Sequence, residues 1–131
     1  MFRIKLHRSK ADALFSDYVR ERAGWACERC FKKFEPYHAQ GLDCSHFYGR
    51  GNKSTRFDLE NAAAMCRGCH QHFTANPELH RHFFLLRLGE KRFDLLTVRF
   101  HTPHRVDEKE IALGLKMELD LLRKKGDGDG D

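Results

Sequence analysis

Five cysteines are the residues whose spacing most clearly predicts chemistry. Four of them form two Cys-x-x-Cys pairs, Cys27 with Cys30 and Cys66 with Cys69, while Cys44 stands alone. A two-residue spacer lets both thiolates of one turn face a single ion, and four thiolates suit tetrahedral Zn²⁺. An odd number of cysteines fits a disulfide framework poorly. The two pairs therefore predict one structural zinc site, and Cys44 is interpreted as a small buried residue rather than a fifth ligand.

Three further residues lie between the cysteine pairs or directly after them: His46, Asn61 and His70. Cutting a phosphodiester bond requires a water molecule to lose a proton near neutral pH, and the ordinary pKa of an imidazole suits that task. It also requires a cation to neutralise the charge that develops on the phosphate and the leaving oxygen. Two histidines held near each other by a zinc site therefore fit the metal-dependent hydrolysis of a nucleic acid.

The order of these three residues, with the last histidine directly after a zinc-type cysteine, resembles that of the HNH, or ββα-metal, nucleases over residues 27–73. The resemblance implies that His46 is the general base and that Asn61 orients it through hydrogen bonds to the backbone. It also implies that His70 is a ligand of a catalytic divalent ion, Mg²⁺ or Mn²⁺. Taken singly, the residues leave three alternatives open: a structural histidine, a turn asparagine and a His70 that binds the zinc.

Three shorter motifs extend the resemblance along the chain. They are LFSDYVR at residues 14–20, STRFD at residues 54–58 and GEKR at residues 89–92. Together they make the chain similar to the phage NinG/Rap recombination proteins over most of residues 11–125. This similarity implies a metal-dependent DNA endonuclease that prefers branched recombination or replication intermediates, such as D-loops and Holliday junctions. The alternative function is a noncatalytic zinc-finger module that binds nucleic acid.

Ser45 departs from the HNH pattern, in which an aspartate or a histidine precedes the general base as a second metal ligand. A serine hydroxyl is a weak ligand for a hard cation. Asp43 lies two residues earlier, on the same face of an extended strand as Ser45, so it is the candidate second ligand, directly or through water. Without Asp43, the ion would be held by His70, substrate phosphate and solvent.

Positive charge is concentrated before the last six residues. Those six hold three aspartates and no basic side chain, so residues 1–125 carry 24 basic and 16 acidic side chains, a net charge of +8 against +5 for the whole chain. Such a surplus fits a polyanionic partner, here DNA. The basic residues crowded around the candidate site are candidate phosphate contacts, with a solvated loop as the alternative: Arg50, Lys53, Arg56 and Arg67.

The helices and strands expected around these residues indicate an α+β fold. The resemblance implies a ββα-metal core, flanked by N- and C-terminal helices. Ser9 opens a capping box before a helix over residues 10–23. Residues 42–47 alternate as a short strand, and residues 56–58 are expected to form a second one. A helix over residues 69–75 completes the predicted core.

Two more helices are expected in the C-terminal part. One starts at Asn76 and Pro77 and ends near Gly89. Its expected apolar face consists of four residues: Leu79, His82, Phe83 and Leu86. The last helix runs from Asp107 to residue 125 with a stripe of four apolar residues: Ile111, Leu115, Leu119 and Leu122. Core packing is the preferred interpretation of this stripe, and a homodimer seam is the alternative.

The pattern as a whole predicts one nuclease domain over residues 1–125, with a zinc and ββα core at 25–75 and a helical part at 76–125. The Gly/Asp tail at 126–131 is expected to be disordered. No apolar run approaches the roughly 20 residues that span a bilayer. We therefore expect no membrane partner and a location in the cytoplasm of the cell, which is the host cell if a phage encodes the chain.

Overall fold

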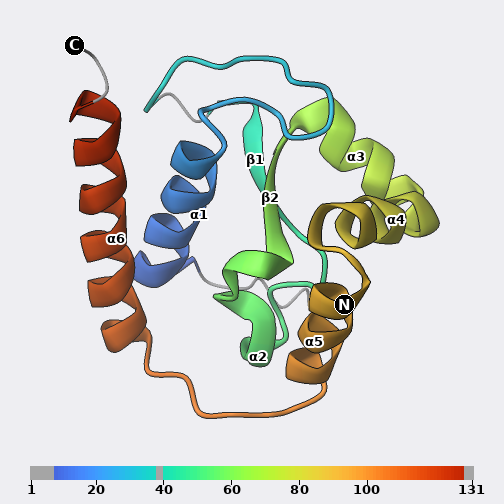
Figure 1. The fold of residues 1–131 in the computed structure, drawn as a ribbon. Coiled ribbons are helices and arrows are strands. Elements are labelled where there is room, and N and C mark those ends of the chain that lie inside the picture. The colour runs from blue at the N-terminus through green and yellow to red at the C-terminus, as the bar shows by residue number, and fades with distance from the viewer. Residues whose placement is uncertain (1–7, 38–39, 129–131) are drawn as a thin grey trace, which may run out of the picture.

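The computed structural model describes residues 8–37 and 40–128, which form helices around two short strands. In order, the elements are α1 (Lys10–Arg22), β1 (Leu42–His46), α2 (Lys53–Arg56), the 3₁₀ turn η1 (Leu59–Asn61), β2 (Ala62–Cys66), α3 (Arg67–Ala75), α4 (Pro77–Leu88), α5 (Glu90–Phe100) and α6 (Glu108–Gly128). Strands β1 and β2 form an antiparallel ribbon in the middle of the helices (Figure 1). The predicted α+β class is confirmed.

Three predicted elements are present with small shifts at their ends. The N-terminal helix ends one residue early, at Arg22, and the first strand ends at His46. The capping box is formed, because the Ser9 hydroxyl accepts a hydrogen bond from the Asp12 N–H at 3.1 Å and the Ser9 N–H donates to the Asp12 carboxylate at 2.8 Å. Helix α3 begins two residues before the expected start, at Arg67.

The second strand lies later in the chain than expected. Residues 56–58 turn instead of extending, because two side chains cap short helices on either side of them. Asn52 accepts a hydrogen bond from the Ser54 N–H at 3.0 Å and starts α2, and Asp58 accepts one from the Glu60 N–H at 3.1 Å and starts η1. Such local bonds compete with strand pairing. The prediction of a strand at residues 56–58 is therefore wrong, and the partner of β1 is β2.

The ribbon is covered by α1 on one side, and α6 covers α1 in turn (Figure 1). Small side chains on β2 allow this close packing: Ala62, Ala63 and Ala64 are fully buried in the same cluster as Phe15 and Val19 of α1. Helix α6 contributes two of its four predicted stripe residues to the interior, Leu115 and Leu119. Core packing is thus confirmed for that stripe.

The apolar face expected for α4 is wrong except at Phe83, which is partly buried against the core. Phe84 and Leu88 are its buried residues, whereas Leu79 and Leu86 are 48% and 71% exposed. The helix turns toward the aromatic side chains around Phe47, which contacts Phe84 with ring centroids 5.5 Å apart. The neighbouring α5 was not expected from the sequence. Its buried residues, Phe93 and Leu96, are too few to give a strong helical pattern.

Two helix ends also differ from expectation. The Asn76 amide does not cap α4; it donates a hydrogen bond to the His72 carbonyl at 2.8 Å and closes α3 instead. Helix α6 continues through Gly128, past the expected end at residue 125, and residues 129–131 of the tail lie outside the described residues. Gly126 does not stop the helix because a helical glycine costs only about 1 kcal/mol.

Candidate metal centre and active-site cleft

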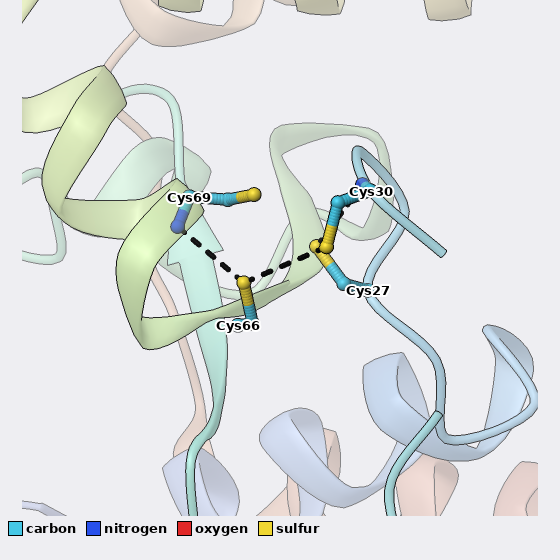
Figure 2. A group of neighbouring side chains, drawn as sticks. All are labelled: Cys27, Cys30, Cys66 and Cys69. Carbon is cyan, nitrogen blue, oxygen red and sulfur yellow. Dashed lines mark hydrogen bonds between the residues drawn. The ribbon is translucent and has the colours of Figure 1, made fainter. Parts of the chain in front are cut away.

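The structure brings together the four cysteines predicted to bind zinc. Cys27 and Cys30 lie in the turn after α1, Cys66 is the last residue of β2, and Cys69 lies in the first turn of α3. Their Sγ atoms all lie within 4.8 Å of one another, and Figure 2 shows the two pairs of side chains facing each other. Cys44 is outside this cluster, as expected for a residue that is not a fifth ligand.

The spacing of the sulfurs fits a tetrahedral metal ion. The Sγ atoms of Cys30 and Cys66 are 3.7 Å apart, far beyond the length of a disulfide bond. Ligands at the usual zinc–sulfur distance of about 2.3 Å lie about 3.8 Å apart at tetrahedral angles. Backbone N–H groups support two of the sulfurs: Cys30 donates to Cys27 Sγ and Cys69 donates to Cys66 Sγ. The four cysteines are therefore positioned to bind zinc.

Residues next to the first cysteine pair attach the cluster to the rest of the fold. The Glu28 N–H donates to the Ala64 carbonyl at 2.8 Å, and the Ala64 N–H donates to the Glu28 carboxylate at 2.6 Å. The Arg29 guanidinium donates to Cys69 Sγ at 3.3 Å. A positive charge at this position compensates the net negative charge of four thiolates around one Zn²⁺.

A cleft of about 530 Å³ lies beside the cluster, between α1 and β1 and the start of α3. Its lining combines histidine, carboxylate and guanidinium groups: Arg8, Asp12, Ser16, Arg20, Leu42, Asp43, Cys44, His46, Arg50, Arg67 and His70. Both histidines of the predicted site and the predicted second ligand Asp43 are in this lining. Because His70 directly follows Cys69 in α3, a metal bound by the cysteines would also fix the position of His70.

Asp43 and His70 contact each other directly. The Asp43 Oδ2 and His70 Nδ1 atoms are 3.0 Å apart, and both side chains are partly exposed to the cleft. A carboxylate oxygen only accepts hydrogen bonds, so His70 Nδ1 donates to Asp43 and His70 Nε2 keeps a lone pair. The Asp43 carboxylate and the Nε2 lone pair of His70 are therefore the groups available to bind a divalent ion. The Arg67 guanidinium lies 3.6 Å from the other Asp43 oxygen.

His46 is held by its neighbours in one orientation. Its Nε2 lies 3.0 Å from the Arg56 carbonyl, and its ring stacks on Phe15 with centroids 5.3 Å apart. A carbonyl only accepts hydrogen bonds, so Nε2 carries the proton and Nδ1 keeps a lone pair. Burial lowers the pKa of His46 below its ordinary value of 6.5, although the bond to the Arg56 carbonyl raises it. The imidazole is therefore neutral at pH 7 and able to accept a proton.

Asn61 is fully buried and holds the segment that follows His46. Its amide oxygen accepts a hydrogen bond from the Tyr48 N–H at 2.9 Å, and its amide nitrogen donates to the Tyr48 carbonyl at 2.9 Å and to the Thr55 carbonyl at 3.0 Å. The Asn61 carbonyl also accepts from the Phe47 N–H at 2.9 Å. Asn61 thus joins the end of β1 to α2, the helix whose Arg56 carbonyl binds His46.

Ser45 and Cys44 face different surroundings. Ser45 is fully buried and is not part of the cleft lining, which agrees with its being a poor candidate ligand. Cys44 does line the cleft, and part of its surface is exposed to solvent. The protein around the Cys44 thiol raises its pKa to about 11 by burial, so the thiol is neutral at pH 7.

The four candidate DNA contacts have different positions. Arg50 and Arg67 line the cleft, whereas Lys53 is exposed in α2, outside the cleft lining. Arg56 is buried, and its guanidinium binds the Asp12 carboxylate with an Nε–Oδ1 distance of 2.9 Å. This ion pair joins α1 to α2, so Arg56 is left out of the phosphate contacts proposed below.

Helix α1 contributes a wall of the cleft that the sequence analysis did not assign to the site. Three of the lining residues follow one another at four-residue intervals in α1, Asp12, Ser16 and Arg20, and Arg8 lies in the lining just before the helix. Residues four apart lie on one face of a helix. This four-residue spacing of polar side chains, next to the buried Phe15 and Val19, is the signal in the sequence from which these residues could have been identified.

Comparison with known families agrees with these observations. Residues 3–125 match the family described as bacteriophage lambda NinG protein. The chain belongs to the NinG family. The match includes both cysteine pairs, the cleft lining and α6 up to residue 125. No curated protein and no solved structure matches this NinG-family chain. Among residues 8–37 and 40–128, no helix is long and apolar enough to cross a membrane.

Proposed function

We propose that this NinG-family chain is a metal-dependent DNA endonuclease of the HNH type, in which β1, β2 and α3 form the ββα-metal core. The observation that carries the proposal is the lining of one cleft by His46, by the Asp43–His70 pair and by arginine side chains. These are a base, a donor pair for a hard cation, and groups that bind phosphate. The resemblance to NinG/Rap proteins adds the preference for D-loops and Holliday junctions.

His46 acts as the general base in this proposal. Its Nδ1 takes a proton from a water molecule as the water oxygen forms a bond to the phosphorus. The bond between phosphorus and the 3′-oxygen breaks, and the 3′-oxygen takes a proton from solvent. The products are a 5′-phosphate and a 3′-hydroxyl end. The lowered pKa of His46 supports this role, because the ring is unprotonated at neutral pH.

Asp43 and His70 would hold the catalytic divalent ion, Mg²⁺ or Mn²⁺. Asp43 offers a carboxylate oxygen and His70 its Nε2 lone pair, and the two side chains lie side by side in the cleft lining. When bound, the ion supplies positive charge to the scissile phosphate and the leaving oxygen. The cysteine cluster has a separate, structural role as a zinc site, because its four sulfur ligands leave no open position for substrate.

DNA is held by the basic side chains around the cleft. Arg50 and Arg67 lie beside His46 and His70, and Arg8 lies in the lining just before α1. Arg20 is buried and donates to the Asp17 carboxylate at 2.9 Å, so, like Arg56, it is not counted as a phosphate contact. Lys53 is exposed in α2 and extends the basic surface. Guanidinium groups bind phosphates in pairs of hydrogen bonds but read no base sequence. This arrangement supports recognition of the backbone and shape of branched DNA rather than of a long sequence.

A cleavage panel tests the proposal. Duplex, nicked, flapped, D-loop and four-way DNA are incubated with the zinc-loaded protein in Mg²⁺ or Mn²⁺. We expect nicking of the branched substrates, reduced about 10²- to 10⁴-fold by His46→Ala with unchanged DNA affinity. His82→Ala is the matched control, because His82 is exposed on α4 and lies outside the cleft lining.

The panel also separates the two candidate functions. A wild-type protein that binds branched DNA tightly but nicks none of the substrates would support the noncatalytic zinc-finger module. Nicking that His46→Ala leaves unchanged would show that another group is the base. Loss of metal-dependent nicking in His70→Ala, with one zinc still bound per chain, would support the separation of the two metal sites.

A further inference from the structure

We propose that the outer face of α6 is a dimer interface, on which a second copy of this chain binds with its own α6 antiparallel. The face is defined by three apolar residues, Leu113, Met117 and Leu121, which we call the outer stripe. Glu110 and Lys124 lie at its two ends. The proposal does not depend on the nuclease chemistry, since none of these residues lines the cleft.

Met117 and Leu121 lie on the side of α6 that faces away from the protein, and Leu113 lies at the edge of this side, where it also lines a groove against the start of α1. Leu115 and Leu119 on the other side are buried, where α6 packs along α1 (Figure 1). Leu113, Met117 and Leu121 are 62%, 60% and 60% exposed. Their four-residue spacing places them on one continuous line along the helix. Single exposed apolar residues are common, but an aligned set of large ones indicates an interaction surface.

The charges at the ends of the outer stripe identify its partner. Glu110 and Lys124 are each seven residues from Met117, two helical turns in either direction, and therefore lie on the same line. Both side chains are exposed, and neither forms an ion pair with another residue of the described chain. One end of the stripe is thus acidic and the other basic.

An antiparallel pair of α6 helices brings these charges together. With a two-fold axis at Met117, Leu113 of one copy lies opposite Leu121 of the other, and Glu110 lies opposite Lys124 at both ends. This satisfies the requirement that a two-fold interface be complementary to itself. A parallel pair would instead bring Glu110 against Glu110 and Lys124 against Lys124, and like charges repel at that spacing.

The interface is small, which sets its expected strength. Three apolar residues from each copy and two exposed ion pairs in all bury less surface than the roughly 1,200–2,000 Å² of standard stable interfaces. The outer stripe therefore predicts a weak dimer that forms as the protein concentration rises. Full-length, zinc-loaded protein in analytical ultracentrifugation is expected to show this concentration dependence, and Met117→Lys is expected to sediment as a monomer throughout.

Charge reversal tests the antiparallel arrangement. Glu110→Lys alone, or Lys124→Glu alone, puts like charges at both ends, and we expect the dimer dissociation constant to rise roughly tenfold. The double variant Glu110→Lys/Lys124→Glu restores opposite charges in an antiparallel pair, so its dissociation constant should return to the wild-type value. Glu118→Lys and Lys125→Glu are matched controls, because both residues are exposed but lie about a quarter turn away from the stripe.

Three results would overturn the proposal. The first is a wild-type protein that stays monomeric at its highest soluble concentration. The second is a dimer that Met117→Lys leaves intact while circular dichroism shows a folded chain. The third is a double variant no stronger than the single reversals, which would exclude the antiparallel pairing of Glu110 with Lys124.

Discussion

The cysteine cluster and the adjoining cleft are built in different ways, although they meet at Cys69 and His70. Each half of the cluster is a local turn, in which a backbone N–H within the pair donates to a cysteine sulfur. The cleft has no such local unit: its lining comes from α1, β1, the loop after β1 and the start of α3. Side chains from one part of the chain must orient groups in another. The cluster therefore provides stability, and the cleft depends on that stability for its geometry.

Removal of the zinc should have the largest effect, because it should unfold both the cysteine cluster and the cleft. Cys66→Ser, or chelation of zinc, is expected to unfold the chain, because a structural zinc contributes roughly 10 kcal/mol or more, as much as the whole stability of a typical domain. Thermal melting followed by circular dichroism, with zinc counted per chain, measures the effect. Cys44→Ser is the matched control: it should keep one zinc per chain and a near-native melting temperature. A Cys66→Ser protein that melts like the wild type would disprove the zinc site.

Asn61→Ala should damage the cleft while leaving the cluster intact. The variant removes three hydrogen bonds of a fully buried side chain and leaves the Tyr48 and Thr55 backbone groups without these partners, so we expect a loss of about 3 kcal/mol in unfolding free energy. Urea unfolding measures the loss, and zinc content should not change. Asn52→Ala removes a single helix cap and should cost about 1 kcal/mol. Equal losses in the two variants would contradict the central position given to Asn61.

The same contrast explains which features could be predicted from the sequence. The cysteine spacing is local, so it identified all four members of the cluster. The candidate site residues His46, Asn61 and His70 could be predicted because their order resembles that of a known family. The resemblance implies a role for each residue but does not give the hydrogen bonds that hold it. The second strand was misplaced because the caps at Asn52 and Asp58 were not weighed against a short extended pattern.

Contacts between distant elements were beyond reach of the sequence. Nothing in the sequence around Arg56 shows that its guanidinium binds Asp12, 44 positions earlier, instead of facing solvent. Likewise, the apolar residues of α4 suggest a face through Leu79 and Leu86, and only the position of Phe47 explains why Phe84 turns inward. Burial in a small protein is decided by which elements meet, and local periodicity does not contain that information.

The pH dependence of cleavage should show that the cleft tunes its base. Burial favours the neutral form of His46, so its pKa in the folded protein lies below the ordinary 6.5. The rate of cleavage by a neutral base falls as the pH falls through that lowered pKa, because His46 becomes protonated. Above that pKa the base is neutral and the rate reaches its full value. We therefore expect the acid limb of the profile of log kcat/KM against pH to have its midpoint below 6.5. A midpoint at or above 6.5 would contradict the proposed role of burial.

The smallest effect is expected at Arg67, which is exposed at the start of α3 and lies between the two regions. Arg67→Ala removes one phosphate contact, so DNA affinity should fall only a few-fold at moderate salt, and the slope of log K against log salt concentration should decrease by about 1. Fluorescence anisotropy over a salt series measures both quantities. Arg105→Ala is the matched control, because Arg105 is exposed in the connection before α6 and lies outside the cleft lining. If both variants change the slope equally, DNA binding depends on overall charge and the cleft has no special part in it. If only Arg67→Ala changes the slope, DNA passes over the junction between the cysteine cluster and the cleft.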